Sequence, residues 1–437
     1  MVDRYRLDAL SILTRLEEGK ALFLDREYNR SFGRYSPHER DTLVSLVRGV
    51  VKFRKKLDGV ARAYLPKWEK LPPFVRNTLR LGIFQLLFHT HVPSFAVVHE
   101  WVEAIKPFQG TAFVSLVNAV LRNVERNLKE HRDDASLWGV DLPPWLEREW
   151  QEMIGEEDLQ DLRRSLALPP SLFVRVNTLK TRVRDLEDFL TRRGIESEKT
   201  VLPGALRVFS SYSDLLGLRE HAQWLFYPQD LGSQVVGHLF GPSPGEKVVD
   251  ACCGVGGKSF LMAQLMENRG LVRAWDKSKR RIGALLRIAQ KSGISIIRPE
   301  VLDCLTIPPV YFETADRLLL DAPCSNLGTI RRNPEVLWKV SKEEAQRVAR
   351  KQLELLLSVF QVVKKGGVMV YSVCTLTREE TISVVEAFEK AKGRAVVRIT
   401  LSLEDFGVHS EKEGWVFLWP HRLECDGFFV AAWRKKG

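Results

Sequence analysis

Apolar and polar positions follow a helical pattern through the first part of the chain. In residues 42–65 and 74–90, apolar side chains recur at spacings of three and four residues. This is the period of an amphipathic helix, and strand patterns are scarce here. Residues 1 to about 130 are therefore predicted to be helical.

A shorter region of mixed pattern comes next. Residues 129–144 are charged and then interrupted by proline, which is typical of a linker. Residues 143–168 have a helical pattern, residues 172–179 alternate like a strand, and residues 182–195 again look helical. We expect a small α+β module at 143–225.

From residue 226 onward, short apolar runs alternate with helical stretches. Each run ends in polar or small residues, and the runs lie at 246–253, 269–276, 317–324 and 366–374. This alternation predicts a Rossmann-like, doubly wound α/β sheet of parallel strands, in which ligands bind at the carboxyl ends of the strands. The predicted domains are thus 1–142, 143–225 and 226–437.

Length and charge add to this picture. The chain has 437 residues, too many for one ordinary core, and a net charge of +11. The positive excess falls in the first and third predicted domains, which fits a nucleic-acid partner or simply a solvated surface. No long apolar run or signal-peptide pattern is present, so we expect a cytoplasmic protein with no membrane partner.

All six cysteines lie between Cys252 and Cys425, and none forms a C-x-x-C pair. The spacing argues against zinc, and no metal is expected. Cysteines inside a cell stay reduced. Disulfides are therefore not expected, and the question is whether any of the cysteines is a nucleophile.

A glycine-rich loop follows the run that ends at residue 251. A phosphate-binding loop would need glycine where Cys252 stands, and a dinucleotide-binding loop would need its third glycine at Ser259. The remaining interpretation is an S-adenosylmethionine loop. Asp276 ends the next run at the distance expected for a ribose-binding carboxylate, although such an acid can also cap a helix. Asp303 could bind the adenine amino group.

Two cysteines follow two other runs. Cys324 comes after Asp321-Ala-Pro, and Cys374 after Tyr-Ser-Val. A single cysteine is usually a buried small hydrophobe, but two at neighbouring strand ends favour chemistry. A thiolate that adds to carbon 6 of cytosine makes carbon 5 nucleophilic enough to accept a methyl group. Asp321 could then contact ring nitrogen 3.

These motifs resemble the RsmB (Sun/Fmu) family of ribosomal RNA 5-methylcytosine methyltransferases over nearly the whole chain. The matching motifs are YPQDLGSQVV, VVDACCGVGGKS, AWDKSKRR, LLLDAPCSNLGTIRRNPEVLW, GGVMVYSVCTLTREE and DGFFVAAWRK, with NTLRLGIFQLLF and VSLVNAVLRNVER in the helical part. The resemblance implies a NusB-like RNA-binding domain, a linker module and a methyltransferase domain.

The resemblance also implies roles for individual residues. Cys374 matches the nucleophile and Cys324 the cysteine that assists product release. The positions that match the S-adenosylmethionine site are Cys252, Cys253, Gly254, Val255, Gly256, Gly257, Lys258, Asp276, Arg281, Asp303 and Asp321. The chain departs from the usual family residues at Val255, Asn326, Leu327 and Thr381.

The resemblance implies methylation of 16S ribosomal RNA by a monomer. Two alternatives stay open at this point. The substrate could be transfer RNA, or the chain could be a non-catalytic RNA-binding scaffold. The two strand-end cysteines argue against a scaffold.

Overall fold

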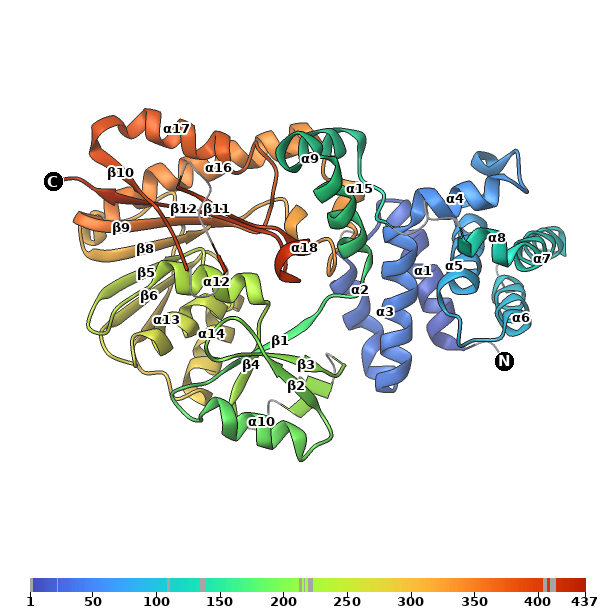
Figure 1. Ribbon diagram of the computed structural model, residues 1–437, viewed down its shortest axis with the longest axis horizontal. Helices are drawn as coiled ribbons and strands as arrows, with labels where there is room; N and C mark the ends of the chain where they lie inside the picture. Colours follow the sequence, from blue (N-terminus) through green and yellow to red (C-terminus); the bar gives the residue numbers. More distant parts are fainter. Residues whose placement is uncertain are drawn as a thin grey trace. The chain divides into compact units, whose positions relative to one another are not determined.

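The computed structural model describes residues 3–21, 23–107, 111–133, 139–211, 214–215, 217–218, 223–403, 407–408 and 414–437 (Figure 1). Part of the predicted linker, residues 134–138, lies outside these ranges. The chain divides into two compact units. The helical unit comprises Met1–Pro144, Glu156–Pro169 and Ile330–Lys339, and the sheet unit comprises Trp145–Gly155, Pro170–Thr329 and Val340–Gly437.

The helical unit confirms the helical pattern of the first part of the chain. Helix α5 is buried on nearly all sides and packs against six other helices. Glycine permits close approach here, because a Cβ atom at Gly49 would lie 2.0 Å from the Phe84 ring. The helices are α1 (Arg4–Glu17), α2 (Leu24–Ser31), α3 (Pro37–Lys52), α4 (Arg54–Arg62), α5 (Pro73–Phe88), α6 (Ser94–Ile105), α7 (Thr111–Arg126), α8 (Leu128–Asp133) and α15 (Val336–Lys339).

Helix α9 (Pro144–Ala167) belongs to both units. Its pattern predicted one helix, but Gly155 has φ 82° and ψ 171°, which no helical residue adopts. The part before the break lies in the sheet unit, and the part after it lies in the helical unit.

The predicted α+β module is a four-stranded antiparallel sheet in the order β2-β3-β1-β4. The predicted strand at 172–179 and the helix after it are present as β1 and α10. Its elements are β1 (Leu172–Val176), α10 (Val183–Thr191), β2 (Glu196–Lys199), β3 (Ala205–Phe209) and β4 (Phe226–Pro228).

The large sheet of the sheet unit has the order β10-β12-β9-β8-β5-β6-β7, with β11 paired to β12. The strands from β9 to β7 are parallel, as predicted. Strand β12 runs antiparallel to both of its neighbours on the path, so the sheet is mixed. The strands are β5 (Lys247–Ala251), β6 (Leu271–Asp276), β7 (Ile297–Val301), β8 (Ala315–Asp321), β9 (Val363–Val373), β10 (Val396–Ile399), β11 (Val416–Leu418) and β12 (Phe428–Lys435).

Helices cover both faces of this sheet. Figure 1 shows α13 and α14 on one face, with α16 and α17 on the other. The four strands that end in the predicted site residues, β6, β5, β8 and β9, are consecutive in the sheet. Their carboxyl ends therefore meet at one edge. The helices are α12 (Leu231–Phe240), α13 (Gly257–Leu265), α14 (Lys279–Lys291), α16 (Lys342–Val359), α17 (Ile382–Lys392) and α18 (Pro420–Leu423).

Candidate active site at the carboxyl edge of the sheet

The two strand-end cysteines come together. Asp321, the last residue of β8, is in register with Ser372 of β9, so the loops after both strands leave the sheet side by side. The Cys324 and Cys374 sulfur atoms lie 2.9 Å apart. The Cys374 thiol also lies 3.0 Å from Oδ1 of Asn326, which can accept its proton in a hydrogen bond.

These two thiols are half-buried, which leaves them accessible to a ligand. The hydrogen bond to Cys374, together with burial, raises the pKa of Cys324 well above its ordinary value. Cys324 therefore keeps its proton as long as it is paired with Cys374.

Asp321 is held from two sides. The Lys258 ammonium donates to one carboxylate oxygen at 2.8 Å, and the Ser372 hydroxyl donates to the other at 2.8 Å. Burial alone would lower the pKa of Lys258, but the charge of Asp321 raises it above the ordinary value. Lys258 is thus positively charged at the bottom of the site.

The loop after β8 is bonded to the loop after β9. The Ser325 backbone N–H donates to the buried Glu380 carboxylate at 2.9 Å, and the Ser325 and Thr375 hydroxyl groups lie 2.9 Å apart. The Gly328 N–H donates to the carbonyl oxygen of Cys374 at 3.0 Å. A Cβ atom at Gly328 would lie 2.1 Å from the Gly427 carbonyl oxygen, so only glycine fits.

The glycine loop lies after β5. A Cβ atom at Gly256, where φ is 92°, would meet the Leu285 side chain at 2.7 Å. Cys252 has φ 64°, a strained backbone conformation for cysteine of the kind that clusters at functional sites. Burial raises the pKa of Cys253, and a hydrogen bond to Cys304 raises that of Cys252. Val255 is 53% exposed.

Asp276 is a loop-binding residue and not the cap of the next helix. Ser278 caps α14 by accepting from the Arg281 N–H. The Asp276 carboxylate accepts instead from the N–H groups of Gly254 at 3.1 Å and Ser278 at 2.8 Å, and it pairs with Arg281 at 3.3 Å. Its side chain is 4% exposed. Asp303 lies two residues after the end of β7, is exposed, and accepts from the Leu305 N–H at 3.0 Å.

Three residues in the site were not predicted from the sequence: Ser372, Asn326 and Glu380. Ser372 could have been found, because side chains two apart on a strand share a face and Ser372 precedes Cys374 by two. Asn326 and Glu380 act through contacts between loops, for which the sequence contains no local signal.

The small module contributes to the glycine loop. Arg175 of β1 is 2% exposed and donates to the Gly257 carbonyl oxygen at 2.9 Å. Its guanidinium lies 4.6 Å from the centre of the Tyr227 ring. This cation is bonded to the first residue of α13.

Within the described parts of the chain, no group of three or more His, Cys, Asp or Glu side chains could hold a metal ion. Over the same residues, no helix is long and apolar enough to cross a membrane.

Family models match three consecutive segments. Residues 4–126 match the NusB family, residues 142–213 match a ferredoxin-like domain of RsmF/B-like methyltransferases, and residues 238–434 match the 16S rRNA methyltransferase RsmB/F model. The first part of the chain is therefore a NusB-like helical domain, and the middle is a ferredoxin-like module.

Curated relatives match over most of their length. The probable ribosomal RNA small subunit methyltransferase B of Bacillus subtilis is 31% identical over 98% of both chains. The ribosomal RNA small subunit methyltransferase B of Thermus thermophilus is 34% identical over 87% of this chain and 86% of its own.

Solved structures agree with the fold. The crystal structure of PH0851 matches all of both chains with a TM-score of 0.79 at 24% identity. A methyltransferase homolog protein from Pyrococcus horikoshii has a TM-score of 0.55 at 27% identity, over 66% of this chain and 93% of its own. The fold, the three matched segments and the near full-length relatives lead to one conclusion: the chain belongs to the RsmB/F family of 16S rRNA methyltransferases.

Proposed function

We propose that this chain methylates carbon 5 of a cytosine in 16S ribosomal RNA, with S-adenosylmethionine as the methyl donor and a covalent bond between Cys374 and carbon 6. The observation that carries the proposal is the pair of sulfur atoms 2.9 Å apart beside an aspartate held by lysine and serine. The names of the Bacillus and Thermus relatives support ribosomal RNA as the substrate. A mouse relative named 28S rRNA (cytosine-C(5))-methyltransferase, 31% identical over 65% of this chain, supports carbon 5 of cytosine as the methylated atom.

The donor set at the sheet edge fits S-adenosylmethionine. The buried Asp276 carboxylate would hold the ribose hydroxyl groups, with Arg281 as its neighbour, and the exposed Asp303 would accept from the adenine amino group. The residues proposed to surround the methionine part are Cys252, Cys253, Gly254, Val255, Gly256, Gly257, Lys258 and Asp321. When bound, S-adenosylmethionine supplies an electrophilic methyl group.

The residues of the chain would then act in order. Cys374, after its proton passes to solvent, forms a bond from sulfur to carbon 6, and the electron pair of the carbon 5–carbon 6 double bond moves through carbon 4 to ring nitrogen 3. The negative charge that develops at ring nitrogen 3 is neutralised by a proton that Lys258 supplies through the Asp321 carboxyl group, which contacts this nitrogen. Carbon 5 takes the methyl group. Loss of its proton then re-forms the double bond and releases the Cys374 thiolate.

Cys324, after its own thiol proton passes to solvent, is proposed to take up that proton, directly or through a water molecule. The hydrogen bond to Cys374 is the largest cause of its raised pKa. When Cys374 is bonded to carbon 6, that hydrogen bond is broken and Cys324 becomes easier to ionise. The arrangement therefore supports a role after methyl transfer.

RNA binding is proposed for the NusB-like domain together with the sheet unit, and the matched segments support the division at 1–142, 143–225 and 226–437. A ribosomal RNA substrate also supports a cytoplasmic location for this chain, as for its bacterial relatives. We propose that the chain acts as a monomer.

The test compares transcribed 16S rRNA with a transfer RNA mixture. Each RNA is incubated with the full chain and S-adenosylmethionine, and 5-methylcytosine is mapped by bisulfite sequencing. A single modified cytosine in 16S rRNA is expected. Modification of transfer RNA alone would replace the proposed substrate, and no modification of either RNA would favour the non-catalytic scaffold.

A further inference from the structure

The loop that carries Cys324 continues directly into a segment that packs in the helical unit. Residues Ile330–Lys339, called here the anchor segment, follow Thr329, the last residue of this stretch in the sheet unit. They end in the short helix α15. No other stretch after residue 169 belongs to the helical unit among the residues that the structure describes.

The anchor segment is bound to the helical unit at several points. The Trp338 indole N–H donates to the Val51 carbonyl oxygen at 3.1 Å, and the Arg54 guanidinium lies 4.0 Å from the centre of the Trp338 ring. The Leu24 N–H donates to the Glu335 carboxylate at 3.1 Å. Arg331 donates to the Pro169 carbonyl oxygen at 2.7 Å.

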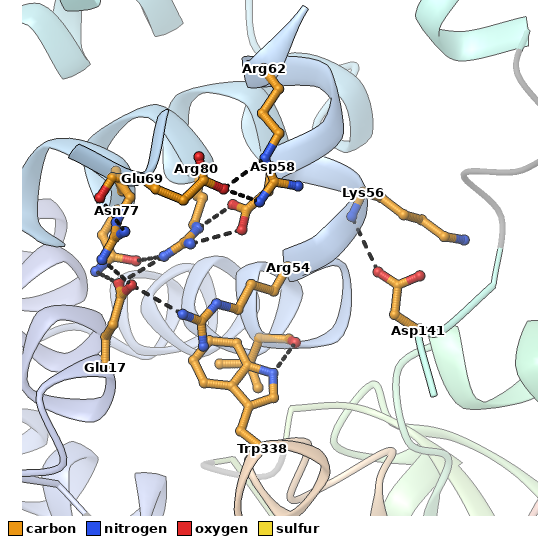
Figure 2. A network of polar contacts seen from close by, with 12 residues as sticks. Glu17, Arg54, Lys56, Asp58, Arg62, Glu69, Asn77, Arg80, Asp141 and Trp338 are labelled. Carbon is orange, nitrogen blue, oxygen red and sulfur yellow. Dashed lines mark hydrogen bonds and ion pairs between the residues drawn. The ribbon is translucent and has the colours of Figure 1, made fainter. Parts of the chain in front are cut away.

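Arg54 does not move freely, because it belongs to a buried ionic network (Figure 2). It donates to Glu17 at 3.0 Å, and Glu17 also accepts from Arg80 at 2.8 Å. Arg80 in turn makes two bonds to Asp58, at 2.6 and 2.9 Å. Trp338 therefore rests on a side chain that the helical core fixes in place.

On the other side of Thr329, the chain is bound just as closely to the nucleophile. Gly328 bonds to the Cys374 carbonyl oxygen, and Thr329 closes a turn by donating to the Asn326 carbonyl oxygen at 2.9 Å. Only Ile330 separates Thr329 from Arg331, and two residue steps span at most about 7 Å. A displacement of the anchor segment must therefore reach the loop that positions Asn326 and Cys374.

We propose that Trp338 is a positioning residue: by fixing the anchor segment to the helical unit, it keeps the loop of Cys324 and Asn326 in the geometry that methyl transfer at Cys374 requires. The inference rests on the proposed function. It gives the helical unit a part in the rate of the reaction, in addition to any part in holding RNA.

The test uses the full chain as wild type, Trp338→Ala and Trp338→Phe, with Phe95→Ala as the control. Phe95 is an aromatic residue of α6 in the same unit and is 65% exposed. The measurements are the single-turnover rate at saturating 16S rRNA and S-adenosylmethionine, the RNA concentration that gives half that rate, and the affinity for S-adenosylmethionine.

For Trp338→Ala we expect the saturated rate to fall about tenfold, because small misplacements of reacting groups slow a reaction by at least this much. Half-saturating RNA and affinity for S-adenosylmethionine should stay within about twofold. Trp338→Phe keeps a ring over Arg54 but loses the N–H donor, so its rate should fall less, by about threefold from wild type. Phe95→Ala should match wild type.

A wild-type saturated rate in Trp338→Ala would overturn the inference, as would an equal fall in Phe95→Ala. If Trp338→Ala fails to bind S-adenosylmethionine because it does not fold, Trp338→Phe decides. A threefold fall in its rate supports the inference, and a wild-type rate overturns it. Failure of the proposed function is distinct, because wild type itself would then form no 5-methylcytosine.

Discussion

Both units bury charged side chains, but they use them differently. In the helical unit, the side chain of Arg80 is 1% exposed and donates to the carboxylates of Asp58 and Glu17. Glu17 also pairs with two further arginines and accepts from Asn77 (Figure 2). Each charge in this network is in contact with at least one opposite charge of the same unit. Such a network holds the helices together.

In the sheet unit, two acids at or next to strand ends, Asp250 and Asp321, are less completely enclosed or paired. Asp250 of β5 accepts from the Ser259 hydroxyl with one oxygen, and its other oxygen has no hydrogen-bond partner among the described residues. Burial raises its pKa to about 7. Asp321 keeps a side chain that is 31% exposed. Buried polar groups without a full set of partners cost folding free energy. Such groups are found at ligand sites, where the ligand can supply the missing partner.

The comparison shows that burial of charge alone does not identify a site. Closed networks between helices serve stability, whereas acids at the carboxyl edge of parallel strands retain lone pairs that a ligand can use.

The largest expected effect is at the nucleophile. Cys374→Ala should lower turnover by at least about 10³-fold, because it removes the thiol proposed to form the bond to carbon 6. Affinity for S-adenosylmethionine, measured by calorimetry, should remain near wild type. Cys425→Ala, at a buried thiol of the same unit, is the matched control and should keep its activity. Substantial turnover by Cys374→Ala would remove the covalent step from the proposal.

The next effect concerns release of the product. Cys324→Ala should trap a covalent complex of protein and RNA that survives a denaturing gel, because the proton at carbon 5 is no longer removed efficiently. The double variant Cys324→Ala with Cys374→Ala should lose that complex. Normal turnover without any trapped complex in Cys324→Ala would mean that this thiol only packs the loop.

Two variants, one in each unit, test this comparison when stability and ligand affinity are measured for both. Arg80→Met leaves two buried acids without their main partner and should cost about 3 kcal/mol of unfolding free energy in denaturant, with unchanged affinity for S-adenosylmethionine. Asp276→Asn should weaken that affinity about tenfold, with a smaller loss of stability. Arg62→Met, at an exposed ion pair with Glu69, is the control and should change stability by less than about 1 kcal/mol. If both variants changed both quantities equally, the distinction between the units would fail.

Much of this architecture follows from local pattern. The periods of three to four residues before residue 130 and the alternation after residue 226 predicted the helical part and the α/β sheet, because side-chain periodicity reports which face is buried. The strand-end position of Cys324 and Cys374 predicted that they would meet, since parallel strands end at one edge.

Other features depend on contacts that no local pattern contains. The apolar run at β12 predicts a strand but not the direction of that strand in the sheet. The direction is set by its pairing with β9, which is antiparallel. Arg80 interrupts an apolar helix in the way that a surface residue would, and its buried partners come from α1 and α4. The motif from Asp321 to Trp338 is continuous in sequence, yet its two ends pack in different units.

The smallest expected effect is a pH dependence of stability in the sheet unit. Glu149 of α9 accepts from the Arg378 N–H at 2.7 Å and faces Glu379, which pairs with Lys342. Burial, with the nearby Glu379, raises the pKa of Glu149 from 4.5 to about 7. Between these two values the folded protein holds a proton that the unfolded chain has released.

Because the folded state binds the extra proton, the stabilisation from Glu149 is complete below pH of about 4.5 and is lost as the pH rises through about 7. Glu149→Gln carries an uncharged amide that can still accept from Arg378, so it should remove this component. Melting temperatures measured from pH 5 to 8 should therefore decline less in Glu149→Gln than in wild type. Glu152→Gln, at an exposed residue of the same helix, is the control and should follow wild type. Parallel curves for wild type and Glu149→Gln would show that Glu149 is ionised throughout. Glu149 would then resemble the acids of the helical network, in that its carboxylate stays charged over this pH range.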